Sequence, residues 1–169
     1  MKILVVVGTR PEAIKMAPVV LRLRSEPGFE TIVCATAQHR DLLDSALALF
    51  GIVPDVDLDL MRPNQTPSAV AAGVLSAFDP LLESAAPDVV LVQGDTTTVM
   101  AASLACFHRG VRIGHVEAGL RTSNLRNPFP EEMNRRVTDL VASLHFAPTP
   151  RSAAALAREG TDPATIHVT

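Results

Sequence analysis

Five charged residues that could do chemistry lie directly after runs of apolar residues, where turns are expected. Arg10 and Lys15 follow the first apolar run, Asp95 and Glu117 follow two later runs, and Glu131 lies just after Pro130. Carboxylates suit proton transfer and the stabilisation of a cationic sugar transition state. Cations near a helix N-terminus suit a phosphate. From the residues alone, the set favours an enzyme that acts on a phosphorylated or nucleotide sugar.

Each carboxylate also has a structural interpretation. Asp95 could cap the next helix, although Thr96 or Thr97 could do so as well. Glu117 could pair with Arg121. Glu131 and its neighbour Glu132 could be ordinary partners of a helix dipole, which acidic residues in a first turn often are. The functional interpretation depends on several loops delivering these groups to one place.

The elements that would position these residues alternate between short β-branched runs and longer Ala/Leu-rich runs. Strands are predicted at Ile3–Val7, Thr31–Thr36, Val56–Leu58, Asp88–Gln93, Val111–Val116, Leu144–Ala147 and Ile166–Val168. Helices are predicted at Pro11–Arg24, His39–Phe50, Pro67–Ala85, Thr97–Arg109, Glu131–Val141 and Ser152–Glu159. Continuous apolar strands are typical of parallel strands buried on both faces. The alternation therefore predicts an α/β fold with one doubly wound parallel sheet, whose ligands bind beyond the carboxyl ends of the strands.

The turn after the first strand reads Gly8-Thr9-Arg10-Pro11-Glu12. Gly8 would permit a tight turn there, and the N-terminus of the following helix would face the crevice and suit an anion. The turn lacks the Gly-x-Gly-x-x-Gly pattern of dinucleotide-binding folds, which removes support for NAD binding.

Composition excludes several other classes. Apolar residues make up 47% of the 169 residues, which is enough for one core, and a net charge of −3 gives no basic face for nucleic acid. No apolar run reaches membrane-spanning length, so a cytoplasmic protein that does not bind membranes is expected. Cys34 and Cys106 are expected to be buried free thiols, the histidines to be structural, and no metal or cofactor is expected.

Several longer motifs resemble those of one family, the non-hydrolysing UDP-N-acetylglucosamine 2-epimerases. The motifs are Gly8–Pro18, Thr36–Arg40, Gln93–Thr96, His115–Thr122 and Pro130–Arg135, and they occur in the family's order. Together they span nearly the whole chain, so the resemblance is more specific than any one of them.

The resemblance implies two Rossmann-like domains facing a cleft, as in glycosyltransferases of the B architecture. It implies interconversion of UDP-N-acetylglucosamine and UDP-N-acetylmannosamine, in the cytoplasm, for cell-surface polysaccharides. The route would be elimination of UDP to a 2-acetamidoglucal and its re-addition. By match to the family motifs, Asp95, Glu117 and Glu131 would be catalytic, and Arg10 and Lys15 would approach the nucleotide and phosphates. No cofactor is implied.

The resemblance also implies partners. By this resemblance, residues 1–169 are expected to be the N-terminal domain, with the C-terminal UDP-binding domain absent, so that either the chain is a fragment or a separate chain completes the cleft. Family members are commonly homodimers. Some bacterial members bind an activating UDP-N-acetylglucosamine near the segment that matches Gln38–Arg40, but Asn64 takes the place of a basic residue in the following loop, so activator binding is not expected here. The chain alone is expected to be inactive. The alternatives are a non-catalytic binding or assembly domain and a nucleotide-sugar glycosyltransferase domain.

Overall fold

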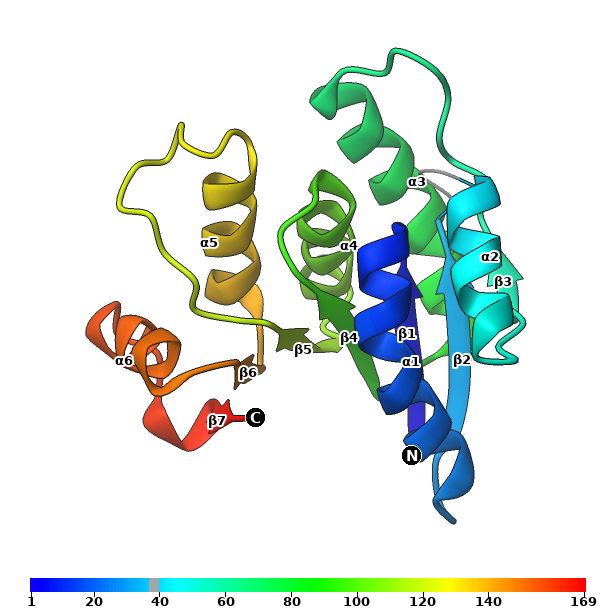
Figure 1. The fold of residues 1–169 in the computed structure, drawn as a ribbon, viewed down its shortest axis with the longest axis horizontal. Helices are drawn as coiled ribbons and strands as arrows, with labels where there is room; N and C mark the ends of the chain where they lie inside the picture. The colour runs from blue at the N-terminus through cyan, green and yellow to red at the C-terminus, as the bar shows by residue number, and fades with distance from the viewer. Residues whose placement is uncertain (37–39) are drawn as a thin grey trace.

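The computed structural model describes residues 1–36 and 40–169, and within them seven strands form one sheet (Figure 1). Every neighbouring pair of strands is parallel, and the order across the sheet is β3-β2-β1-β4-β5-β6-β7. The strands are β1 (Lys2–Val7), β2 (Glu30–Ala35), β3 (Val56–Asp57), β4 (Val89–Gln93), β5 (Arg112–Val116), β6 (Leu144–Ala147) and β7 (Ile166–Val168). The predicted α/β doubly wound sheet is confirmed.

Six α-helices join these strands in the described part of the chain. They are α1 (Arg10–Ser25), α2 (Arg40–Leu49), α3 (Pro67–Ala85), α4 (Thr97–His108), α5 (Glu131–Val141) and α6 (Pro150–Arg158), followed by a short 3-10 turn at Pro163–Thr165. All the predicted elements form, with boundaries that differ by at most two residues from the predicted ones. The predicted first residue of the second helix, His39, lies outside the described residues.

Strand β1 shows why the apolar runs are continuous. Ile3, Val5 and Val7 pack into one core with α1 and α2, whereas Leu4 and Val6 pack into a second core with α3 and α4. Because both faces of the strand are covered, neither set of alternate side chains can be polar. Burying these side chains is the main source of the sheet's stability.

The site is positioned by the reversal of strand order beside β1. The chain adds β2 and β3 on one side of β1, then crosses through α3 to add β4 and the later strands on the other side (Figure 1). The turns that leave β1 and β4 therefore diverge at the carboxyl edge of the sheet, which opens a crevice between them. None of the helices in residues 1–36 and 40–169 combines the length and apolar character needed to span a membrane.

Candidate functional site

A cavity of about 400 Å³ lies at this reversal, beyond the carboxyl ends of β1, β4 and β5. Its wall includes Lys15 from α1, Asp95 from the turn after β4, and Glu117 from the turn after β5. The remaining lining residues are Thr9, Pro11, Glu12, Gln93, Gly94 and Thr96. The structure thus brings two of the three predicted carboxylates and one of the two predicted cations to one edge, as expected.

Glu117 is held in the cavity wall from both backbone and side chain. Its backbone adopts φ +69°, a left-handed conformation that non-glycine residues rarely occupy and that is common at functional sites. Lys15 Nζ lies 2.6 Å from Glu117 Oε2, and Gln93 Nε2 donates to the same oxygen. The alternative pairing with Arg121 is wrong, because Arg121 binds Asp139 and Glu159 instead.

Asp95 is oriented by α5 rather than by the helix it precedes. Arg135 Nη2 lies 2.5 Å from Asp95 Oδ2, and Asn134 Nδ2 donates to the Asp95 carbonyl at 2.9 Å. The N-cap of α4 is Thr96, whose hydroxyl accepts the Val99 amide. The interpretation of Asp95 as a helix cap is therefore wrong, and its carboxylate is left at the cavity wall.

Glu131 lines a second, larger cavity of about 840 Å³ that shares Asp95 with the first. Its other walls come from the loop between β3 and α3, which includes Arg62 and Asn64, and from the start of α4. Glu131 Oε2 is buried and has no hydrogen-bond partner among residues 1–36 and 40–169. Leaving a buried carboxylate oxygen without a hydrogen bond costs free energy. An unpaired oxygen of this kind is therefore unusual for a residue with a purely structural role.

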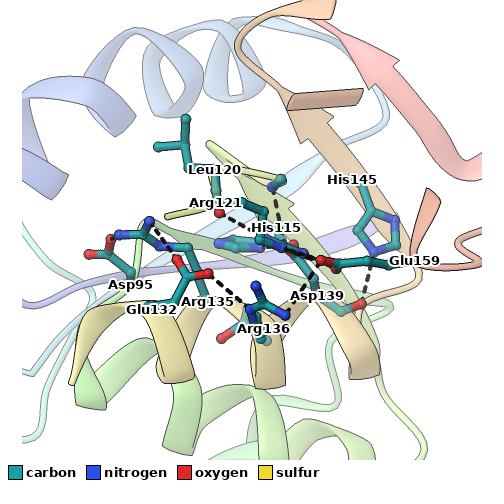
Figure 2. Close-up of polar contacts among 12 residues, drawn as sticks. Asp95, His115, Leu120, Arg121, Glu132, Arg135, Arg136, Asp139, His145 and Glu159 are labelled. Atoms are coloured by element: carbon teal, nitrogen blue, oxygen red, sulfur yellow. Dashed lines mark hydrogen bonds and ion pairs between the residues drawn. The ribbon is translucent and has the colours of Figure 1, made fainter. Parts of the chain in front are cut away.

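Glu132, the next residue, is fully buried and fully paired. It accepts hydrogen bonds from the Thr122 amide, from Arg135 and from Arg136, at 2.9 to 3.1 Å. The interpretation of the two glutamates as simple dipole partners does not describe Glu132, which is the centre of an ion-pair cluster (Figure 2).

Glu12 closes the turn after β1. Its Oε2 accepts the amides of Gly8 and Thr9, and its Oε1 accepts the Thr96 hydroxyl, so it ties the β1 turn to the β4 turn. Burial raises the pKa of the Glu12 carboxyl above its ordinary value, while these donors oppose that rise. The anion expected at the start of α1 would have to displace this internal carboxylate.

Gly8 and Arg10 differ from expectation in detail. Gly8 is needed for close packing rather than for a special turn, because a Cβ there would lie 2.5 Å from Thr36 Oγ1. Arg10 is exposed at the first residue of α1 and is not among the described residues that line either cavity.

Three residues of the site were not predicted as functional: Glu12, Gln93 and Arg135. Arg135 could have been found, because an arginine four residues after Glu131 on an amphipathic helix lies on the same helix face. Gln93 gave no signal beyond its place in a motif.

Both cysteines are buried free thiols, as expected, and burial raises their pKa to about 12. His145 has the structural role expected of the histidines, since it is buried and bonds the Asp139 carbonyl at 2.9 Å. Within the part of the chain that the structure describes, no group of three potential metal ligands comes together.

Comparison with known proteins gives consistent matches. The family model for UDP-N-acetylglucosamine 2-epimerase matches residues 21–169. The UDP-N-acetylglucosamine 2-epimerase of Salmonella typhimurium is 53% identical over all 169 residues, which correspond to 45% of that protein. The chain therefore spans about half the length of the curated relatives it matches.

Solved structures agree with the sequence matches. The Neisseria meningitidis UDP-GlcNAc 2-epimerase, solved with UDP-GlcNAc bound, superposes with a TM-score of 0.97 at 50% identity; the match covers 100% of this chain and 46% of that one. The Methanocaldococcus jannaschii UDP-GlcNAc 2-epimerase, solved with UDP-GlcNAc and UDP, gives 0.93 at 33% identity, covering 99% of this chain and 46% of that one.

Proposed function

Because the chain belongs to the UDP-N-acetylglucosamine 2-epimerase family, we propose that it forms one wall of a site that interconverts UDP-N-acetylglucosamine and UDP-N-acetylmannosamine. The observation that carries this proposal is the meeting of Asp95, Glu117 and Lys15 in one cavity at the sheet reversal. Glu131 joins them through the second cavity, which shares Asp95. Residues 1–169 would be the N-terminal domain of the complete site.

The chemistry explains why several carboxylates are needed. The C2 proton of the sugar is barely acidic, so cleavage of the C1–O bond must lead, and UDP leaves with the bonding electrons. The cationic character that builds at C1 is stabilised by fixed negative groups, for which Asp95 and Glu117 are placed. Loss of the C2 proton to a carboxylate then gives the 2-acetamidoglucal. Return of a proton to the opposite face of C2 and re-addition of UDP at C1 give the epimer.

Glu131 suits the proton-transfer role, because it lines the larger cavity and its buried Oε2 has no hydrogen-bond partner in the described structure that would stabilise the charged form. Lys15 suits a phosphate contact, since its side chain is 49% exposed at the cavity while its ammonium remains within 2.6 Å of Glu117. Arg10, exposed at the start of α1, would act only on a ligand group that extends beyond the cavity.

The relatives are about twice as long as this chain, and the residues that line the two cavities all come from this first half. We propose that the second half, in the same or another chain, supplies the opposite wall and most contacts to UDP. Residues 1–169 alone are then expected to give no measurable conversion. Production of the manno epimer by the purified 169-residue protein would contradict this division of labour.

The test of the function is a chimera in which residues 1–169 replace the matching 45% of the Salmonella typhimurium enzyme. We expect the chimera to be active, and Glu117→Gln to lower its turnover by about 100-fold or more, since one such electrostatic contact is worth roughly 3 kcal/mol. Glu26→Gln is the matched control, because Glu26 lies at the far end of α1 in an ion pair with Arg22. Normal turnover by Glu117→Gln would make Glu117 structural. A chimera that binds substrate without converting it would favour the binding-domain alternative.

We further propose that the protein works in the cytoplasm as a homodimer. Large apolar side chains are exposed at several helix ends, including Leu140 at 84% and Leu49 at 79%. Such surfaces favour self-association when they are contiguous. Light scattering behind size exclusion, at micromolar concentration and on dilution, should detect a dimer. A monomer near 18 kDa under all conditions would contradict it.

A further inference from the structure

A chain of ion pairs starts at Asp95, which lines both cavities, and connects charged residues of β5, α5 and the neighbouring turns (Figure 2). From Asp95 it passes through Arg135, Glu132 and Arg136 to Glu159, and then through Arg121 and Asp139 to His115. His115 closes the circuit, because its Nε2 lies 2.7 Å from the carbonyl oxygen of Gly94, the residue before Asp95. Both ends of the circuit therefore meet at the turn that carries Asp95.

The hydrogen-bond partners of His115 fix the number of its protons. The Gly94 carbonyl can only accept, so Nε2 must donate to it. Nδ1 lies 2.5 Å from Asp139 Oδ1, while Asp139 Oδ2 accepts from Arg121 at 2.8 Å and from the Gly119 amide at 3.2 Å. Burial alone would raise the pKa of Asp139, but the His115 and Arg121 contacts outweigh it and leave the pKa below its ordinary value. The Arg121 guanidinium and the Gly119 amide both donate to Oδ2, which favours the carboxylate form of Asp139, so Nδ1 of His115 donates to Oδ1 as well.

The charges of the circuit agree with this count. Its carboxylates alternate with arginines, and the set is neutral only if His115 carries a positive charge. His115 is 0% exposed and Asp139 only 5%, so an uncompensated charge on either side chain would cost much free energy.

We propose that His115, as a doubly protonated imidazolium, is a positioning residue that holds the Gly94–Asp95 turn and so sets the place of the Asp95 carboxylate. Arg135 fixes the carboxylate of Asp95 from α5, and His115 fixes its backbone from β5. The consequence for turnover rests on the proposed function, whereas the protonation of His115 does not.

His145 provides a matched control. It is the partner of His115 on the neighbouring strand β6 and is similarly buried, at 2%. Its Nε2 bonds the Asp139 carbonyl at 2.9 Å, and its Nδ1 contacts the Thr165 hydroxyl at 3.3 Å. Replacing it removes a buried histidine of the same sheet without touching the Gly94 carbonyl.

The first experiment is NMR on the 169-residue chain with histidine rings labelled with ¹⁵N at neutral pH, the His115 signals being assigned by their loss in His115→Gln. We expect both ring nitrogens of His115 to show protonated shifts. An unprotonated ring nitrogen on His115 would overturn the proposal. The Gly94 carbonyl carbon and the Asp95 amide should shift in His115→Gln and stay in place in His145→Gln; an equal response to both variants would also overturn it.

The second experiment measures kinetics in the Salmonella chimera. His115→Gln should lower kcat by about 100-fold, because a small displacement of a reacting group can cost that much, while KM changes little. His145→Gln should change kcat by no more than a few-fold. A normal kcat in His115→Gln overturns the proposal. If the unsubstituted chimera is inactive, the proposed function fails, and the NMR experiment still decides the state of His115 and its hold on Gly94. The proton count itself is read from the spectrum of the unsubstituted chain, and His145→Gln identifies the signals of the second buried histidine.

Discussion

The N-termini of α1 and α5 both place a glutamate in the first helical turn, yet the two ends are built in opposite ways. Helix α1 has a complete capping box, in which the Thr9 hydroxyl accepts the Glu12 amide and Glu12 accepts the Thr9 amide. Helix α5 starts after Pro130 with no side-chain cap in the described structure, and the Oε2 of Glu131 is buried without a partner. The carboxylate of Glu12 is held by hydrogen bonds within the fold, whereas Glu131 lines a cavity and keeps one oxygen unpaired in the described structure.

The comparison shows that the N-terminus of α5 is stabilised by the contacts of Glu132 rather than by an N-cap side chain. Glu132 anchors the start of α5 through Arg135, Arg136 and the Thr122 amide. Because these contacts fix the first turn, Glu131 can be left without a hydrogen bond and still have a defined place. The stabilising role and the proposed chemical role thus fall on adjacent residues.

The largest effect is expected from removing the anchor of α5. Glu132→Ala would leave Arg135 and Arg136 without their buried partner, and breaking a buried pair costs roughly 3–5 kcal/mol. Urea unfolding of the 169-residue chain measures this loss. Glu26→Ala removes an exposed glutamate of α1 and should change stability little. Similar effects of both changes would refute the central place of Glu132.

Glu131→Gln should separate chemistry from stability. We expect turnover of the chimera to fall by about 100-fold or more, since general acid–base catalysis commonly contributes 10²–10⁴-fold. The midpoint of thermal unfolding should hold or rise, because glutamine keeps the shape of the side chain and removes the negative charge of a carboxylate whose Oε2 is buried and unpaired in the described structure. A clear loss of stability with normal turnover would reverse the comparison between Glu131 and Glu132.

Much of this arrangement was predictable from the sequence. Parallel strands are apolar throughout, so β1, β4 and β5 were found, and their carboxyl ends had to place Asp95 and Glu117 at one edge. Which glutamate is structural was not predictable, because it depends on distant partners. Glu12 is fixed by Thr96, which is 84 residues away, and Arg121 turned to Asp139 rather than to Glu117. Spacing along the chain does not encode such pairings, and they follow only when the turns are packed.

A smaller effect is expected in the pH dependence contributed by Glu12. Because burial raises the pKa of this carboxyl above its ordinary value of 4.5, the native state binds the proton more tightly than the unfolded chain does. The stability that Glu12 contributes is therefore greatest below pH 4.5 and declines as the pH rises through its native pKa. Glu12→Gln does not titrate, and its amide oxygen can still accept the Gly8 and Thr9 amides, while its amide nitrogen would donate to the Thr96 hydroxyl instead of accepting from it. The stability of wild type relative to Glu12→Gln should fall between pH 4.5 and neutrality, measured by urea unfolding at each pH. A difference that is constant or rises over this range would show that the local donors outweigh burial.

The smallest effect is expected from the other arm of the capping box. Thr9→Ala removes the hydroxyl that accepts the Glu12 amide at 3.4 Å, a long bond, while Glu12 continues to accept the amides of Gly8 and Thr9. Loss of a threonine cap costs about 1 kcal/mol on average, and the remaining arm should hold the cost to about 0.5 kcal/mol. Thr149→Ala at the start of α6 is the matched control, because Thr149 caps Ser152 at 3.1 Å without a glutamate arm. We expect Thr149→Ala to cost more than Thr9→Ala in urea unfolding. The reverse order would mean that Thr9, rather than Glu12, holds the turn, and that the closed end of α1 depends on its own cap after all.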